Sequence, residues 1–485
     1  MILKVKYKLT VVLSLILLLF ILIGSVSAAD NTTNVIDNIN TTSNSATVNN
    51  SLDVVTFNDY HSENLNQTIS DQVLSNTYTE NNNNNNNVFF SNQTIENNKQ
   101  NTVLGISNDE ISTLNNENTV TIYISPDGTR TGQSIDSPTT WDNAIKDVNN
   151  GGIIYFLDGE YTNILNQTIN KNITLTAINI GAAIINAQGK GYIFNNTENN
   201  TLNITGLIFV NGTGCLINIE GDDCYYGGAI YSEGILNVKD STFTNNTATN
   251  FGKGGAICMS NGTVINSTFT ANTATISGNG GAIYILENGN GTVINSTFIG
   301  NNATGTDSSS TSSGGAIGIM GNGTVINSHF INNTATHGGA IYIYDTGIVI
   351  NSTFIGNNAT GTDSSNGGAI YTTNGNVINS IFKGNTASYN GGAISISNNA
   401  NVSGSSFINN TASDSGGAIY NGIGNLTVSG SSFINNTANS GGGGAIQGDG
   451  NVTVSSGSSF INNTASKVGG AIYTNANVNV SGSSF

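Results

Sequence analysis

The sequence has little charge and almost no arginine. Charged residues make up 8% of the 485 residues, whereas a typical globular domain contains about a quarter. The 29 acidic residues outnumber the 12 basic ones, the net charge is −17, and Arg130 is the sole arginine. Because nucleic-acid binding needs clustered lysine and arginine, we expect no nucleic-acid partner.

Proline and cysteine are also scarce, with two and three residues respectively. The cysteines, Cys215, Cys224 and Cys258, are too few for a disulfide framework. Cys215 and Cys224 could close a small loop in an exported protein, or all three could be thiols packed as small apolar residues. No CxxC pair, Cys/His cluster, phosphate loop or cofactor motif occurs, so we expect no metal and no cofactor.

One long apolar run is present, at the N-terminus. Lys4, Lys6 and Lys8 precede an apolar stretch over residues 9–23, and small residues follow it, as in a secretory signal. The run is shorter than the ~20 residues that a membrane-spanning helix needs. We therefore expect a cleaved signal peptide over residues 1–28 and export to the cell surface, the alternative being an uncleaved anchor. Residues 29–118 are rich in Asn, Thr and Ser and poor in apolar residues, which indicates a disordered linker.

Regular patterns begin near residue 119. The stretch TVTIYI (119–124) alternates apolar and polar residues as a strand does, and TTWDNAIKDV then places Trp141, Ala144, Ile145 and Val148 at helical spacing. Several short strand patterns follow. A solenoid's first coil must be covered, so we expect residues 119–226 to form an N-terminal cap with a short helix and the first coils.

Residues 227–485 repeat one phrase, which marks a repeat architecture. GGAI recurs at intervals of 24–34 residues and begins at Gly227, Gly254, Gly280, Gly314, Gly338, Gly367, Gly391, Gly416, Gly443 and Gly469. A Ser-x-Phe sequence ends each unit, with Phe243, Phe269, Phe298, Phe330, Phe354, Phe382, Phe407, Phe433, Phe460 and Phe485.

The fixed positions of the repeat predict an all-β right-handed parallel β-helix with one coil per unit. The Ile of GGAI never varies whereas the next residue does, as expected of a strand with Ile inward and its neighbour outward. A valine stands five residues before most of the phenylalanines, for example Val264 and Val428. Each unit thus offers three inward anchors between turn-forming residues, and neighbouring coils bury them for each other.

A fixed asparagine stands three residues after each complete Phe. Asparagine tolerates left-handed turns, and its amide can bond its counterpart one coil away, so we expect a buried ladder. The ladder residues are Asn246, Asn272, Asn301, Asn333, Asn357, Asn385, Asn410, Asn436 and Asn463. Glycosylation sequons overlap the same region and could be modified in an exported chain. They begin at Asn245, Asn302, Asn332, Asn358, Asn409, Asn435 and Asn462.

GGA[I/L/V] and FxxN repeated together resemble the chlamydial polymorphic membrane protein repeat. The whole arrangement, a signal, a polar linker, an SPDGT…W…A cap and then the array, is similar to the Asn/Thr-rich adhesin-like surface proteins of methanogenic archaea. The resemblance covers residues 119–485 and implies a β-helix with a role in adhesion or cell-envelope interaction. Chlamydial proteins of this type end in an outer-membrane barrel, and no such segment occurs here.

The tyrosines that follow GGAI are the candidate binding residues. On a β-helix they would form a broken exposed stripe, suited to stacking on sugar rings or anchoring a protein partner, although tyrosine also simply favours strands. They are Tyr231, Tyr284, Tyr342, Tyr371, Tyr420 and Tyr473.

Catalytic candidates are weak. Asp307 and Asp363 hold equivalent positions and could form the carboxylate pair of a glycoside hydrolase, whose members lie roughly 5–9.5 Å apart. However, they belong to a copied block of sequence, which explains their equivalence without catalysis, and one intervening coil would separate them by about 10 Å. Asp222 and Asp223, with Glu220, could bind calcium or form a solvated loop, and His329 has no identifiable partner.

His337 likewise has no identifiable partner, and the four lysines of the array do not occupy corresponding positions. We therefore expect no enzyme. The expected protein is a non-catalytic adhesin-like surface protein that binds surface glycans or proteins of other cells or of the cell envelope. The alternatives are a carbohydrate-active β-helix enzyme, a lyase or glycoside hydrolase, and a structural envelope component. Because Phe485 ends the sequence inside a unit, we also expect the complete protein to add further coils and then a cap or a wall-attachment module.

Overall fold

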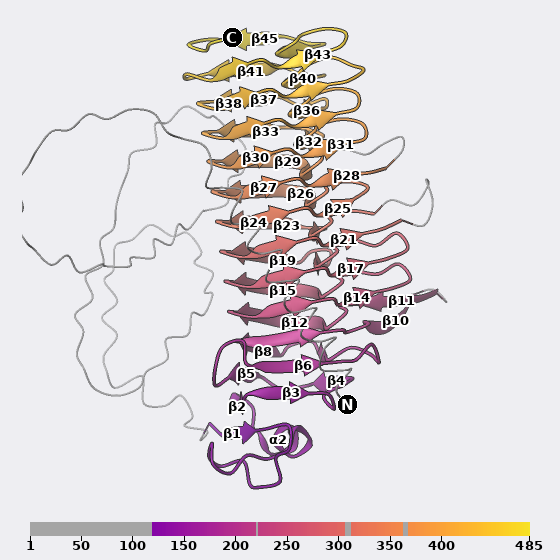
Figure 1. The fold of residues 1–485 in the computed structure, drawn as a ribbon, viewed down its shortest axis with the longest axis vertical. Helices are drawn as coiled ribbons and strands as arrows, with labels where there is room; N and C mark the ends of the chain where they lie inside the picture. The colour runs from indigo at the N-terminus through magenta and orange to yellow at the C-terminus, as the bar shows by residue number, and fades with distance from the viewer. Residues whose placement is uncertain (1–118, 220–221, 306–311, 362–366) are drawn as a thin grey trace, which may run out of the picture. The chain divides into compact units, whose positions relative to one another are not determined.

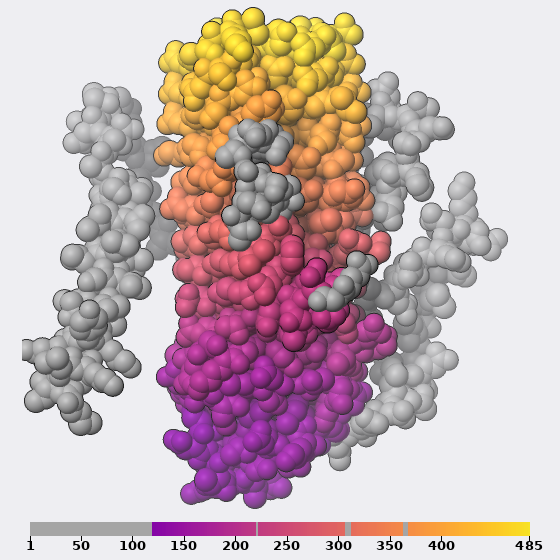
Figure 2. Space-filling view, turned by 90° about the vertical axis from the view of Figure 1, so that its right-hand side faces the viewer, coloured from indigo at the N-terminus to yellow at the C-terminus, as the bar shows by residue number. Residues whose placement is uncertain are grey.

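A computed structural model describes residues 119–219, 222–305, 312–361 and 367–485. The predicted signal peptide and linker, residues 1–118, lie outside these residues. The described chain winds into a parallel β-solenoid, whose coils are stacked in sequence order (Figure 1). The space-filling view shows the same order as successive colour bands, each coil lying directly on the one before (Figure 2). The predicted parallel β-helix is therefore confirmed.

The N-terminal end of the described solenoid carries one short helix, α2 (Trp141–Asp147), capped by Thr140, whose side chain accepts a hydrogen bond from the Asn143 amide. Trp141, Ala144 and Val148 are buried, as the helical spacing predicts. The Trp141 ring lies 5.3 Å from the Phe194 ring, and its Nε1 donates to Gln167 Oε1 at 2.8 Å. The helix thus packs on the first coils.

Three parallel sheets run along the solenoid, each gaining strands from successive coils. The first, called the phenylalanine sheet here, has 12 strands, each with a phenylalanine except the first two: β3 (Gly159–Tyr161), β6 (Ala183–Asn186), β9 (Leu207–Val210), β13 (Thr242–Thr244), β16 (Thr268–Thr270), β20 (Thr297–Ile299), β24 (His329–Ile331), β27 (Thr353–Ile355), β30 (Ile381–Lys383), β34 (Ser406–Ile408), β38 (Ser432–Ile434) and β42 (Ser459–Ile461). The second has nine two-residue strands: β14 (Thr247–Ala248), β17 (Thr273–Ala274), β21 (Asn302–Ala303), β25 (Thr334–Ala335), β28 (Asn358–Ala359), β31 (Thr386–Ala387), β35 (Thr411–Ala412), β39 (Thr437–Ala438) and β43 (Thr464–Ala465).

The third sheet, called the large sheet here, has 22 strands and carries the Ile and Val anchors. Its strands are β1 (Thr121–Ile124), β2 (Gly152–Phe156), β4 (Gln167–Ile169), β5 (Ile173–Ala177), β7 (Phe194–Asn196), β8 (Thr201–Thr205), β12 (Ile230–Lys239), β15 (Ile257–Ile265), β18 (Ile283–Ile285), β19 (Asn290–Ile294), β22 (Ile317–Ile319), β23 (Asn322–Ile326), β26 (Ile341–Ile350), β29 (Ile370–Ile378), β32 (Ile394–Ile396), β33 (Ala400–Ser403), β36 (Ile419–Asn421), β37 (Leu426–Ser429), β40 (Ile446–Gly448), β41 (Val452–Ser455), β44 (Ile472–Thr474) and β45 (Val478–Val480). A two-stranded antiparallel hairpin, β10 (Cys215–Ile219) with β11 (Asp222–Tyr226), stands apart from the three sheets.

The two glycines of GGAI are required by the turn that connects the sheets. The first has a positive φ, for example +65° at Gly391, a conformation that favours glycine. A Cβ on the second, Gly392, would lie 2.1 Å from the carbonyl oxygen of Gly417 in the next coil. The motif is therefore invariant because backbones of neighbouring coils touch there.

The predicted inward stacks are confirmed. Strand register places Ile on Ile, Val on Val and Phe on Phe in successive coils, as in Phe407 on Phe433. The Phe407 and Phe433 rings are parallel within 2°, with centroids 4.8 Å apart. Both rings are buried, so the phenylalanine stack is a continuous part of the core.

The predicted asparagine ladder is also confirmed, with one correction. Asn272 Nδ2 donates to Asn301 Oδ1 in the next coil and to the Phe243 carbonyl in the previous one, both at 3.0 Å. The left-handed position, however, belongs to the residue before the ladder asparagine, as at Asn245, whose φ is +56°. The ladder residue faces the core, where its amide replaces water as a partner for backbone groups.

A second buried ladder, of serines, accompanies the asparagines. The backbone N–H of each serine donates to Oγ of the serine one coil on, as from Ser267 to Ser296 at 3.1 Å. Each Oγ in turn donates to a carbonyl two residues earlier, such as Ile265, or three residues earlier in the case of Ser458. These are the serines of the Ser-x-Phe signature, whose structural role the sequence pattern did not reveal.

Candidate functional site: two outward faces of the large sheet

The tyrosines after GGAI form a file on the outward side of the large sheet. Strand register aligns Tyr342 with Tyr371, and the same position continues through Tyr420 and Tyr473. The expectation that this file is exposed is wrong for Tyr231 and Tyr284, which are 6% and 3% exposed. The other four are half-buried.

The burial has a geometric cause. The residue before each GGAI forms its own file of parallel bridges, including Lys253, Asn279 and His337. The side chains of this file lie beside the tyrosine rings and cover one side of them. Lys253 Nζ lies 5.3 Å from the centre of the Tyr284 ring, and the His337 ring lies 5.8 Å from that of Tyr371.

Most tyrosine hydroxyls in the file are already bonded within the protein. Tyr420 donates to Asp449 Oδ2 at 2.6 Å, and Asn475 Nδ2 donates to the other oxygen of this carboxylate at 2.8 Å. Burial and the Asp449 carboxylate raise the pKa of Tyr420. Tyr342 and Tyr371 stack with ring centroids 5.1 Å apart and planes 5° from parallel, and burial raises the pKa of Tyr342 to about 12.

The three cysteines lie together at the N-terminal end of the tyrosine file. Cys215 and Cys224, on the hairpin, and Cys258, on β15, form a small apolar cluster with Tyr231 and Tyr284 that is separate from the main core. All three are free thiols. Of the two alternatives that the sequence left open, a bond between Cys215 and Cys224 or three packed thiols, the structure has the packed thiols. Burial raises the pKa of Cys215 to about 11, and Glu233 adds to this effect.

A second outward face, called the amide face here, lies further along the same strands. In each coil two outward side chains, amides or hydroxyls, flank one inward residue such as Gly375 or Ala400. The stacked coils therefore form two parallel files of polar side chains. The first file is Asn374, Asn399, Asn425, Asn451 and Asn477, and the second is Asn376, Asn401, Thr427, Thr453 and Asn479. Sequence reasoning missed this face, although the spacing Asn-x-Asn or Asn-x-Thr repeats visibly in each of these five units.

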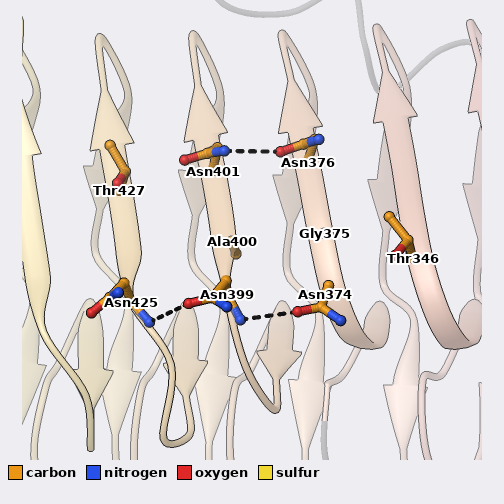
Figure 3. Close-up of a pocket in the computed structure, with 9 residues that line it drawn as sticks. All are labelled: Thr346, Asn374, Gly375, Asn376, Asn399, Ala400, Asn401, Asn425 and Thr427. Atoms are coloured by element: carbon orange, nitrogen blue, oxygen red, sulfur yellow. Dashed lines mark hydrogen bonds between the residues drawn. The ribbon is translucent and has the colours of Figure 1, made fainter. Parts of the chain in front are cut away.

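Hydrogen bonds along each file hold the amides in fixed positions. Asn401 Nδ2 donates to Asn376 Oδ1 at 3.1 Å, and the Asn425 backbone N–H donates to Asn399 Oδ1 at 2.9 Å (Figure 3). The files repeat at about 4.8 Å from coil to coil and lie roughly 6.7 Å apart along each strand. The result is a regular array of donors and acceptors on a flat sheet.

Between the two files lies a shallow groove of about 240 Å³. Asn374 and Asn399 lie on one side and Asn376 and Asn401 on the other (Figure 3). The intervening Gly375 and Ala400 are buried, so their backbone forms the floor. The groove lining contains no charged residue.

The structure does not assemble the catalytic candidates. Asp222 and Asp223 are exposed on β11, where Asp223 accepts a hydrogen bond from Asn218 within the hairpin, and Glu220, Asp307 and Asp363 lie outside the described residues. His329 is exposed on β24. Among the described residues, no three His, Cys, Asp or Glu side chains are grouped to hold a metal ion. The described part of the chain also contains no helix long and apolar enough to span a membrane.

Seven segments of the array match the Chlamydia polymorphic membrane protein repeat. They are residues 240–260, 266–286, 327–344, 351–373, 379–397, 404–422 and 457–475. The chain therefore carries repeats of this type, which agrees with the resemblance seen in GGAI and FxxN. No curated protein matches the sequence.

Solved structures with similar coordinates share little sequence identity with this chain. Pectate lyase Pel9A is 16% identical with a TM-score of 0.35, over 64% of this chain and 75% of that one. The catalytic domain of the GH87 α-1,3-glucanase, solved with tetrasaccharides, is 12% identical with a TM-score of 0.41, over 75% of this chain and 69% of that one. ORF18 of Geobacillus virus E2 is 15% identical with a TM-score of 0.35, over 74% and 62%. These likenesses concern the fold alone.

Proposed function

We propose that this chain is an exported, adhesin-like surface protein that binds a neutral glycan along the amide face without cleaving it. Repeats of the polymorphic membrane protein type suggest a surface or membrane protein, and residues 1–28 have the pattern of a secretory signal. The similarity of the cap and array to adhesin-like surface proteins of methanogenic archaea supports the same role.

The amide face is the observation that carries this proposal. Sugar hydroxyls both donate and accept hydrogen bonds, and so do the amides of Asn374, Asn399 and their neighbours. Because the files are already fixed by bonds between coils, ordering them on binding costs little entropy. A repeating polymer can use the same contacts in coil after coil, so many weak bonds add up along one chain.

The composition of the face favours a neutral glycan over other partners. The groove has no charged residue to recognise an anionic polymer. Protein interfaces usually centre on large buried anchors such as Trp, Tyr or Arg, and the ten residues of the amide face are all Asn or Thr. Tyr342 and Tyr371 are half-buried and stacked, and provide a secondary place for a sugar ring to stack.

A glycan array probed with the full exported chain tests the proposal. We expect binding to neutral oligosaccharides, reduced at least tenfold in the double variant Asn399→Ala/Asn401→Ala. The matched control is Ser406→Ala/Ser432→Ala, two half-buried residues on the outer side of the phenylalanine sheet, which should bind as the unaltered chain does. Unchanged binding in the first variant would place the ligand elsewhere.

A sugar-release assay on each bound glycan separates binding from catalysis. Binding with no oligosaccharide in solution supports the proposal. Release of shorter chains would show an enzyme instead, and a folded chain that binds no glycan would leave a structural role in the envelope as the better explanation.

A further inference from the structure

Two left-handed corners border every strand of the phenylalanine sheet in the array. One lies three residues before the Phe and the other two residues after it, and both have φ between about +49° and +77°. The corners before Phe are Asp240, Asn266, Asn295, Asn327, Asn351, Asn379, Gly404, Gly430 and Gly457. The corners after Phe are Asn245, Ala271, Gly300, Asn332, Gly356, Gly384, Asn409, Asn435 and Asn462.

Glycosylation sequons, Asn-x-Ser or Asn-x-Thr, occupy these corners in an alternating way. Three coils have the sequon before Phe, at Asn266, Asn295 and Asn351, and each has Ala or Gly at its other corner. Five coils have it after Phe, at Asn245, Asn332, Asn409, Asn435 and Asn462. No coil has a sequon at both corners, although asparagine suits either conformation.

Two of those five coils show most clearly that the two sequons do not occur together. In each of them the corner before Phe is Asp or Asn, but no complete sequon begins there. In the coil of Phe243, Asp240 replaces the asparagine before Phe. In the coil of Phe330, His329 replaces the threonine, so Asn327 no longer heads a sequon. His329 is exposed and has the same backbone register as Thr297 and Thr353, so packing does not require the change.

The coil of Phe382 has no corner sequon and differs in a second way. Ile381 replaces the threonine that would complete a sequon with Asn379, and Gly384 fills the corner after Phe. The coil's outward residue after Phe is Lys383, whereas the coils of Phe243 and Phe269 have Thr244 and Thr270 at this position and the other six have Ile299, Ile331, Ile355, Ile408, Ile434 and Ile461. These six form an exposed or half-buried stripe along the sheet, called the isoleucine stripe here.

The corner asparagines are sterically and chemically available. All eight are exposed, because a positive φ turns the side chain away from the core. The residue after each is the Ser or Asn of a ladder, buried in every case except the half-buried Asn463, so the fold depends on the middle of the sequon more than on its first residue. Asn245 and Asn266 bond to Asn211 and Asp240, whereas the other six form no side-chain hydrogen bond within the described residues.

We propose that these eight asparagines carry N-linked glycans, one at a corner of each of these coils, and that the glycans of the six coils with an outward isoleucine cover the isoleucine stripe. The stripe lies directly between the two files of corners, since each isoleucine is one residue after a Phe. An exposed apolar stripe on a flat sheet otherwise invites association with other chains. Where the coil has no glycan, at Phe382, the stripe is interrupted by the charge of Lys383.

The modification is a glycosyl transfer. The Nδ2 atom of the asparagine forms a bond to C1 of a sugar, and the bond between C1 and a phosphate oxygen of a lipid-linked sugar donor breaks. The lipid phosphate leaves with the bonding electrons, and one amide proton passes to a base of the transferase. The donor and transferase are supplied by the exporting cell, so this inference rests on the proposed export.

Mass spectrometry of the full chain, purified from the cells that export it, tests the inference. We expect a glycan mass on peptides containing each of the eight corner asparagines, and its loss at one site in Asn409→Gln. Asn425 and Asn451 head sequons on the amide face, but neither has a positive φ, so we expect these two sites to be bare. Equal occupancy there would refute selection by corner geometry.

A gain of modification is the sharper test. Gly384→Asn places a sequon before Asn385 and Thr386 in the one coil that has none, and this corner has a φ of +62° with open space around it. We expect one additional glycan. Gly384→Asp is the matched control, because aspartate also tolerates the left-handed corner but completes no sequon.

Protease treatment of intact cells separates this inference from the proposed function. A chain that is digested at the surface yet bare at all eight corners would refute glycosylation alone, and glycan binding by the amide face could still hold. A chain protected from protease would refute export and both proposals.

Enzymatic removal of the glycans should raise the binding of a hydrophobic dye, and unchanged dye binding would show that they do not cover the stripe.

Discussion

Asn410 and Asn436 lie one coil apart in the core, and Asn410 Nδ2 donates a hydrogen bond to Asn436 Oδ1 at 3.0 Å. The same Nδ2 group donates to the carbonyl of Phe382 at 3.0 Å in the preceding coil. One amide therefore connects three successive coils. Because both asparagines are fully buried, water cannot replace these bonds.

The ladder predicts a large cost for Asn410→Ala. The change removes the bond that the Phe382 carbonyl accepts, the acceptor of the Asn385 backbone N–H and one of the two acceptors of Asn385 Nδ2, at about 1–3 kcal/mol for each buried group left unpaired. We expect the free energy of unfolding in urea, followed by circular dichroism, to fall by several kcal/mol. Asn409→Gly, at the exposed corner next to it, should change it by less than about 0.5 kcal/mol. Similar losses in both variants would contradict a buried ladder.

The phenylalanine stack predicts a comparable cost for Phe407→Ala, about 3–5 kcal/mol. The ring is fully buried between Phe382 and Phe433, so its removal leaves a cavity. Tyr420→Ala removes a half-buried ring and its bond to Asp449, and should cost less. Hydrogen exchange should show opening in the coil of Phe407 only in the first variant. Equal thermal shifts would refute the inward and outward assignments.

The contact between glycine backbones predicts that Gly392→Ala cannot be accommodated without moving two coils apart. The added Cβ would lie 2.1 Å from the Gly417 carbonyl oxygen. Gly375→Ala is the control, because Ala400 holds the equivalent position in the next coil and the nearest atom to the added Cβ, at 2.9 Å, belongs to the Thr372 side chain and not to backbone. We expect the first variant to lower the melting temperature strongly and the second to lower it much less. A mild effect of Gly392→Ala would show that the coils have more clearance than the structure indicates.

The thiol cluster predicts a loss of stability at high pH. Burial raises the pKa of Cys215 from 9.0 to about 11, and burial raises that of Cys258 too. The unfolded chain therefore ionises first, so the stabilisation is complete below about pH 9 and is lost as the pH rises from about 9 to about 11. The urea midpoint should fall over this range, and fall less in Cys215→Ala. Parallel curves for the two proteins would exclude a contribution from this thiol.

Sequence alone predicted the parts of the fold that repeat with an invariant residue. GGAI, the valine, the phenylalanine and the asparagine after it each occupy one register position, and each is stacked where the repeat placed it. Trp141 likewise packs where its helical spacing put it. A position that never varies in ten internal copies has one environment, so its burial can be inferred by comparing the copies.

The outward faces could not be inferred in the same way. Tyr284 and Tyr420 hold the same register position, yet one is buried beside Lys253 and the cysteine cluster and the other is half-buried beside Asp449. Those surroundings depend on which side chain precedes GGAI and how it packs beside the tyrosine. The amide face was missed for a related reason: Asn399 and Asn401 look like ordinary turn residues until strand register aligns them with Asn374 and Asn376.

The ladders also affect how the number of coils encoded by the gene can change. Each coil bonds mainly to the coil before it and the coil after it, through the same atoms at every step, so removing whole coils rejoins matching surfaces. The stretches beginning at Val293 and Val349 are near-identical and two coils apart. Recombination between the corresponding stretches of DNA would shorten or lengthen the array by two coils, about 10 Å, and leave every stack in register. The distance spanned by the array can thus vary between cells of one lineage while its core chemistry stays constant.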